Sequence, residues 1–154
     1  MKKKQILWIV FALYVAVVLK LTIFRQHTMD SRQWNFSLFV QLIEVYQTNG
    51  LWEFLRLFLG NIGWFVPFGF LIPLLWQKQT FWKVTAGGCF FSFLIELMQF
   101  VFRKGYAELD DLMLNTLGCM LGYGIYYIFT KKSCLNRWKF SIKKEKNSTK
   151  FLDK

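Results

Sequence analysis

One apolar stretch of this chain carries polar side chains at helical spacing. They are separated by four, three and four residues, so they share one helical face: Ser92, Glu96, Gln99 and Arg103. Ionisable residues are costly inside hydrocarbon, which makes Glu96 a candidate functional residue. A carboxyl group at membrane depth beside Arg103 could do general acid/base work or hold Mg²⁺ next to a phosphate. The opposite face of this stretch, which includes Phe91 and Ile95, is expected to contact lipid.

A second polar group precedes the last apolar run of the chain. Asp110 and Asp111 fall where a helix is expected to begin, and carboxylates there cap free backbone N–H groups. Asn115 lies one turn deeper on the same face as Asp111. The candidate catalytic residues are Glu96, Asp110 and Asp111, and the candidate binding residues are Asn61, Gln99, Arg103, Glu108 and Asn115. The alternative is a satisfied structural network, with Glu96 paired to Arg103 or Asn115 and both aspartates capping a helix.

These polar residues lie in a chain that is too apolar for an ordinary soluble domain. It has 154 residues, of which 55% are hydrophobic and 20% aromatic, and three cysteines are too few for a disulfide scaffold. Four runs approach the roughly 20 residues that cross a bilayer. We therefore expect an all-α polytopic membrane protein with four transmembrane helices, at about residues 6–24, 55–76, 81–102 and 112–129.

The net charge of +11 is a topology signal. Residues 1–5, 77–83 and the tail after Phe129 hold 14 of the 20 basic residues and two of the nine acids. Basic flanks face the cytoplasm, so both termini are expected there, with residues 131–154 forming a basic cytoplasmic tail beside a transmembrane domain over 1–130. This tail is expected to touch anionic lipid, and no nucleic-acid module is present.

Three further features concern the helices themselves. Apolar residues recur at helical spacing within residues 25–54, which predicts an amphipathic helix on the outer leaflet. Pro67, with Gly63 and Gly69 nearby, predicts a kinked or broken second helix that faces protein there. Gly118 and Gly122 form a G-x-x-x-G pattern, which lets another helix approach closely.

Three blocks of the sequence resemble the VanZ-like family. They run over residues 61–73, 92–99 and 110–123, in the order and spacing of that family. The resemblance implies a small membrane protein of a kind associated with teicoplanin resistance in Gram-positive bacteria. The family's usual D-x-D-D run reads Glu108-Leu109-Asp110-Asp111 here, so the first carboxylate is one methylene longer. That departure weakens the case for a tight metal site, and neither a metal nor a cofactor is expected.

The sequence leaves three classes of function open. The first is a cell-membrane protein whose outward-facing site binds a cell-envelope lipid, a wall precursor or a glycopeptide. The second is an enzyme acting on a lipid-linked phosphate through Glu96, Asp110 and Asp111; no H-E-x-x-H, G-x-S-x-G or Walker motif supports it. The third is a small transporter or an accessory subunit. The oligomeric state is not determined by these features.

Overall fold

Four long helices dominate the computed structural model, which describes residues 3–22, 34–35, 39–76, 78–103 and 107–152, with side chains described as far as Lys131. The helices are α1 (Lys3–Thr22), α2 (Val40–Leu75), α3 (Phe81–Phe102) and α4 (Leu109–Leu152). A short parallel pair joins β1 (Trp34–Asn35) to β2 (Ala107–Glu108). Apart from this pair, the described residues with regular secondary structure are helical.

Each helix contains a segment long and apolar enough to cross a membrane: Lys4–Thr22, Leu42–Leu75, Phe81–Phe102 and Leu109–Lys131. The expectation of a four-helix multi-pass membrane protein is therefore confirmed. The third span matches its predicted bounds, and the fourth helix is longer than predicted because it continues to Leu152. Residues 23 and 24, the predicted end of the first span, lie outside the described residues.

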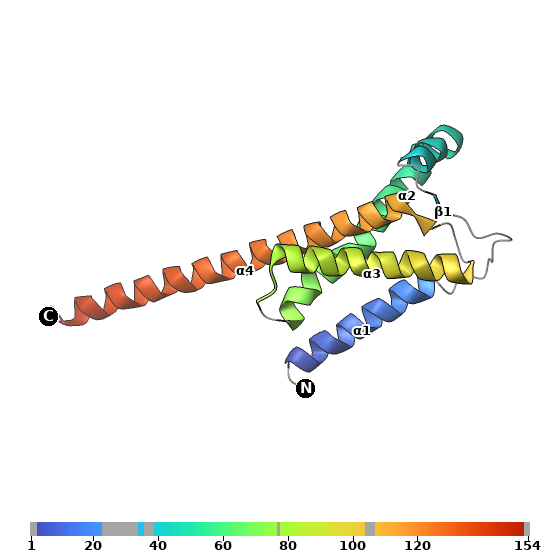
Figure 1. The fold of residues 1–154 in the computed structure, drawn as a ribbon. Coiled ribbons are helices and arrows are strands. Elements are labelled where there is room, and N and C mark those ends of the chain that lie inside the picture. The colour runs from blue at the N-terminus through green and yellow to red at the C-terminus, as the bar shows by residue number, and fades with distance from the viewer. Residues whose placement is uncertain (1–2, 23–33, 36–38, 77, 104–106, 153–154) are drawn as a thin grey trace.

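The helices alternate in direction, so Lys3 and the part of α4 beyond Lys131 lie at the end of the bundle opposite β1 (Figure 1). This arrangement places the starts of α1 and α3 together at one end. It places the start of α4 and the pair of short strands at the other. Polar residues near the end of α3 and the start of α4 therefore lie close together, as the short connection between these helices requires.

The second helix has its non-helical residue at Gly50, whereas the sequence predicted a kink or a break near Pro67. Gly50 has φ 84° and ψ 179°, and it is the residue within α2 whose backbone is non-helical. Glycine tolerates this positive φ because it has no Cβ. Pro67 and Pro73 remain within the helix, since neighbouring helices can compensate for a proline in a membrane span. The helix is therefore not broken at Pro67, and its neighbours Phe65 and Phe68 are buried against protein, as predicted.

The bend at Gly50 divides α2 into a longer stretch that continues to Leu75 and a short one over residues 40–49. This stretch falls in the predicted amphipathic segment 25–54, much of which lies outside the described residues. Leu42 is buried, whereas Val40, Ile43 and Tyr46 are exposed. The stretch is helical, as predicted, and its position on the outer leaflet stays a prediction.

The backbones of α2 and α4 are in direct contact at three glycines. A Cβ atom added at Gly118 would lie 2.0 Å from the carbonyl oxygen of Ile62, and one at Gly122 would lie 2.1 Å from that of Val66. A Cβ atom at Gly69 would lie 1.9 Å from the carbonyl oxygen of Cys119. No side chain fits at such distances, so the prediction of close helix approach at Gly118 and Gly122 is confirmed.

The buried face of α3 includes apolar residues as well as the polar residues that the sequence placed there. Ser92, Glu96 and Gln99 are buried as expected, but Ile95 is only 2% exposed. Phe91 stacks on Phe68, with 5.3 Å between ring centroids. The expectation that Phe91 and Ile95 face lipid is therefore wrong, because α1 and α2 cover this side of α3. The buried cluster there consists of Val18, Phe65, Phe68, Val84, Ile95 and Cys119.

We predict that Gly118→Ala lowers the stability of the bundle by about 1–3 kcal/mol, the usual cost of overpacking. The added methyl group would have to push α2 away from α4 at Ile62. Thermal melting of the purified protein in detergent measures the effect. Gly124→Ala is the matched control, because nothing lies within 4 Å of its added Cβ atom. Equal melting temperatures for the two variants would show that the helices do not need the close contact.

Candidate functional site

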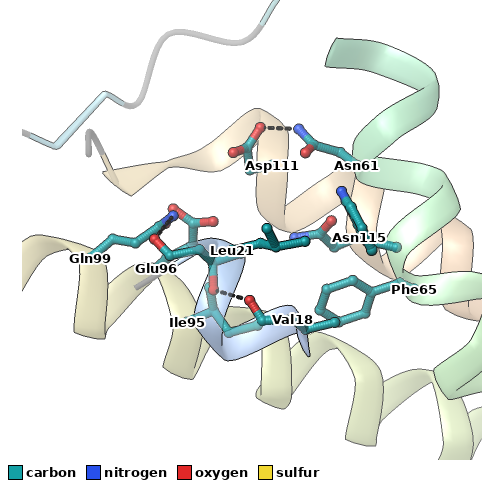
Figure 2. Close-up of a pocket in the computed structure, with 11 residues that line it drawn as sticks. Val18, Leu21, Asn61, Phe65, Ile95, Glu96, Gln99, Asp111 and Asn115 are labelled. Atoms are coloured by element: carbon teal, nitrogen blue, oxygen red, sulfur yellow. Dashed lines mark hydrogen bonds between the residues drawn. The ribbon is translucent and has the colours of Figure 1, made fainter. Parts of the chain in front are cut away.

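A cavity of about 380 Å³ lies between the four helices, on the side of the bundle where α3 ends and α4 begins. Figure 2 shows that polar and apolar side chains from different helices share this space. Eleven of the described residues line it: Val18, Leu21 and Thr22 of α1, Asn61, Trp64 and Phe65 of α2, Ile95, Glu96 and Gln99 of α3, and Asp111 and Asn115 of α4.

The α2–α4 contact brings two polar residues together at the edge of this cavity. The side-chain amide of Asn61 donates a hydrogen bond to the carboxylate of Asp111 (Figure 2). Asn61 directly precedes Ile62, the residue whose carbonyl touches Gly118, and Asp111 lies two turns before that glycine. The close packing of the two backbones therefore places this pair.

A second hydrogen bond ties α4 to α3 below the cavity. The amide of Asn115 donates to the hydroxyl of Ser92 at 2.9 Å, and both residues are buried. Ser92 lies one turn before Glu96 on α3, so this bond fixes the rotation of α3 that directs Glu96 toward the cavity. Asp111 and Asn115 share one face of α4, as their spacing predicts, and both line the cavity.

Glu96 is only 3% exposed, and its partner among the described residues is a backbone N–H group rather than a cation. One of its carboxylate oxygens accepts the backbone N–H of Glu108 at 3.0 Å. The alternative in which Glu96 pairs with Arg103 or Asn115 is not the arrangement seen here. Asn115 donates to Ser92, and Arg103 is exposed at the end of α3, where it adopts the left-handed conformation with φ 54°.

Gln99 brings an unpaired acceptor to the same wall. Its side-chain N–H donates to the backbone carbonyl of Thr22 at 3.4 Å, which connects α3 to α1. Its side-chain oxygen is buried and has no hydrogen-bond partner within the described residues. The whole residue is 8% exposed. A buried acceptor without a hydrogen bond costs free energy of folding, so its presence here calls for an explanation.

Asp110 faces away from the cavity and holds the start of the 40–49 helix. It is 3% exposed, and both of its carboxylate oxygens lie 2.9 Å from the backbone nitrogen of Phe39. A carboxylate beside the free N–H groups of a helix start is favourable. The sequence predicted that Asp110 caps its own helix, but its N–H partner here belongs to the start of α2.

The structure thus separates the candidate residues into two groups. Five of them line one cavity: Asn61, Glu96, Gln99, Asp111 and Asn115. The other three do not line it. Asp110 accepts the backbone N–H of Phe39 at the start of α2, and Glu108 donates its backbone N–H to Glu96. Arg103 is exposed at the end of α3. The functional roles of all eight stay predictions. Sequence reasoning missed Thr22 and Trp64, although the polar end of the first run and the tryptophan beside Asn61 were available signals.

The lining determines what the cavity can bind. Among the described residues, its polar side chains are two carboxyl groups, three amides, one hydroxyl group and one indole, with neither lysine nor arginine. Within the described ranges, no three His, Cys, Asp or Glu side chains gather closely enough to hold a metal ion. The described side chains therefore offer hydrogen bonds and carboxyl groups to a ligand.

We predict that Asp110→Ala releases the 40–49 helix from α4 and destabilises it by about 0.5–2 kcal/mol, the usual cost of losing a capping acceptor. Hydrogen exchange of the amides in residues 40–49 measures this, and faster exchange is expected. Glu44→Ala is the control, because its exposed side chain lies on the same helix. Unchanged exchange in Asp110→Ala would mean that the carboxylate does not hold this segment.

Comparison with known proteins agrees with these features. A family model described as VanZ/LLP1 matches residues 11–130, which include every residue that lines the cavity. Protein VanZ of Enterococcus faecium is 30% identical over 76 residues, covering 49% of this chain and 47% of that protein. The chain thus aligns with about half the length of this curated relative, and no solved structure matches it. Because the family model spans most of the chain, the protein belongs to the VanZ/LLP1 family.

Proposed function

We propose that this protein resides in the cell membrane and binds a cell-envelope lipid or wall precursor in the cavity at Glu96. The observation that carries the proposal is a space of about 380 Å³ between four membrane-spanning helices, lined by two carboxyl groups and three amides. Polar groups at membrane depth are expensive and mark functional sites by default. A purely structural network would be expected to pair its members, and the side-chain oxygen of Gln99 has no partner among the described residues.

The distribution of basic residues supports an opening toward the outer leaflet. Residues at the other end of the bundle carry most of the lysines, and basic flanks face the cytoplasm. With both termini inside, the ends of α1 and α3 and the start of α4 face outward. The cavity would then be reached from the side on which wall precursors and glycopeptides are found.

The size of the cavity favours a head group over a whole glycopeptide. Ligand pockets commonly measure about 300–1,000 Å³, so this cavity is at the small end of that range. The sequence resemblance associates the family with teicoplanin resistance, and ligand binding in this cavity offers a physical explanation for that association. We propose that the protein lowers glycopeptide sensitivity by binding an envelope lipid or precursor, not by enclosing the antibiotic.

The same lining argues against an enzyme that acts on a lipid-linked phosphate. Such a substrate needs a cation, and the sequence assigned that part to Arg103. Arg103 is exposed and does not line the cavity, and Asp110, one of the proposed catalytic carboxylates, holds α2 instead. Two carboxyl groups would repel the phosphate of a substrate that carries no cationic group, so binding is a better-supported function than phosphate chemistry.

We predict that a native envelope lipid or precursor co-purifies with the protein and is lost in Glu96→Gln, which removes the charge but keeps the shape. Mass spectrometry of the extracted protein identifies the molecule. In cells, the variant should also change teicoplanin sensitivity without altering the envelope lipids themselves.

Glu44→Gln is the matched control, since it removes an exposed carboxylate outside the cavity. Melting temperatures of both variants show whether they are folded. Identical bound molecules in wild type and Glu96→Gln, with both folded, would contradict binding at this site. Disappearance of an envelope product in the variant would instead point to an enzyme.

We predict the orientation from labelling with a membrane-impermeant maleimide. Glu44→Cys should react in intact cells, whereas Lys78→Cys should react only after permeabilisation, because these exposed residues lie at opposite ends of the α2 span. The unaltered chain, which has three cysteines of its own, provides the background. The reverse pattern would place the cavity on the cytoplasmic side.

A further inference from the structure

The described lining of the cavity holds two carboxyl groups and no cationic side chain. Each of the three amide groups donates one of its two N–H bonds within the protein: Asn61 to Asp111, Asn115 to Ser92 and Gln99 to Thr22. The hydroxyl of Thr22 donates to the carbonyl of Val18 at 2.7 Å. Among the acceptors, one carboxyl oxygen of Glu96 accepts from the backbone of Glu108 and one of Asp111 accepts from Asn61, whereas the buried amide oxygen of Gln99 accepts no hydrogen bond within the described residues.

The unpaired oxygen of Gln99 is an independent sign of a missing donor. It belongs to a residue that is 8% exposed and lines the cavity one turn after Glu96. These two side chains therefore face the same space from one helix, while Asp111 faces it from α4 (Figure 2). A ligand that carries several N–H donors and a positive charge would satisfy the amide oxygen and balance the carboxylates together.

We propose that the cavity binds a primary ammonium group, held by the acceptors of Glu96, Gln99 and Asp111. This proposal rests on the proposed binding function and names the chemistry of its ligand. A primary ammonium has three donors and a compact charge, which matches three converging acceptors. Val18, Leu21, Phe65 and Ile95 form the apolar wall and accommodate the carbon atoms that carry the amine.

Two sources could supply this group. One is the head group of an aminolipid such as phosphatidylethanolamine, which would enter from the bilayer between the helices. The other is a soluble amine, such as an amino sugar or a peptide amino group. The side chain of Trp64 lines the cavity and is 44% exposed, so the bundle offers an edge at which a lipid head group could enter. The recognition chemistry is the same for both sources.

The decisive experiment compares lipids that differ only at the head group. Wild-type protein in detergent is titrated with phosphatidylethanolamine, phosphatidylcholine and phosphatidylglycerol of identical acyl chains, and binding is measured by native mass spectrometry. Phosphatidylcholine keeps the phosphate and the positive charge but has no N–H donors, whereas phosphatidylglycerol has no ammonium. We expect phosphatidylethanolamine to bind about tenfold more tightly than either, the effect of one good charge-assisted hydrogen bond.

Two substitutions of Gln99 test its role as an acceptor, one expected to abolish the lipid preference and the other to increase it. Gln99→Leu removes the unpaired oxygen and should abolish the preference for phosphatidylethanolamine over phosphatidylcholine. Gln99→Glu adds a carboxylate and should increase the preference. Glu53→Gln is the control, because Glu53 forms an exposed ion pair with Arg56 outside the cavity. A preference unchanged in both Gln99 variants overturns the assignment of this residue.

The outcomes separate this proposal from the proposed function. Equal binding of phosphatidylethanolamine and phosphatidylcholine, or tighter binding of phosphatidylglycerol, overturns the ammonium site but leaves an envelope ligand in place. If wild type retains no envelope molecule from its native membrane, the proposed function itself fails. Competition by soluble ethanolamine or glucosamine at equal concentrations identifies a free amine as the source, and its absence identifies the lipid.

Discussion

Backbone atoms of α2 and α4 touch because Gly69, Gly118 and Gly122 leave no side chain between them. In lipid, helices gain little from burying apolar surface, so close packing and hydrogen bonds hold them together. The position of this contact determines which polar residues meet. Ile62 rests on Gly118, and the preceding Asn61 therefore reaches Asp111 across the helix pair. The cavity forms immediately beyond this contact.

The acidic residues of the site have different tasks, although they are close in sequence. Asp110 holds the backbone N–H of Phe39 and thereby anchors the 40–49 helix, whereas Asp111, the next residue, lines the cavity. Glu96 combines both tasks, because one of its oxygens accepts the N–H of Glu108 while its side chain remains in the cavity lining. Structural hydrogen bonds thus orient the same groups that are available to a ligand.

The two short strands and the start of α2 are tied to the site by hydrogen bonds of the backbone. The parallel pair joins Asn35 to Glu108, and Glu108 donates its N–H to Glu96. The strands β1 and β2 and the start of α2 are therefore linked to the two buried carboxyl groups of Glu96 and Asp110. A change at either carboxylate acts on the shape of the site as well as on its charge.

The sequence by itself determined the features that depend on residues close together in the chain. The length and apolarity of the runs predict four spans, helical spacing places Ser92, Glu96 and Gln99 on one buried face, and the glycine spacing predicts a close helix contact. These features follow from periodicity and side-chain size, which are properties of the chain itself. The family resemblance had the same basis, because its motifs are short blocks with fixed spacing.

Only the tertiary structure decided how the helices face one another. Ile95 and Phe91 are covered by α1 and α2, which no pattern within α3 reveals. Asp110 and Asp111 are adjacent and chemically identical, and successive positions on a helix point about 100° apart, so one meets α2 at Phe39 and the other meets Asn61. Partners far apart in sequence determine these roles. The sequence therefore names the polar residues, and packing assigns each one its partner.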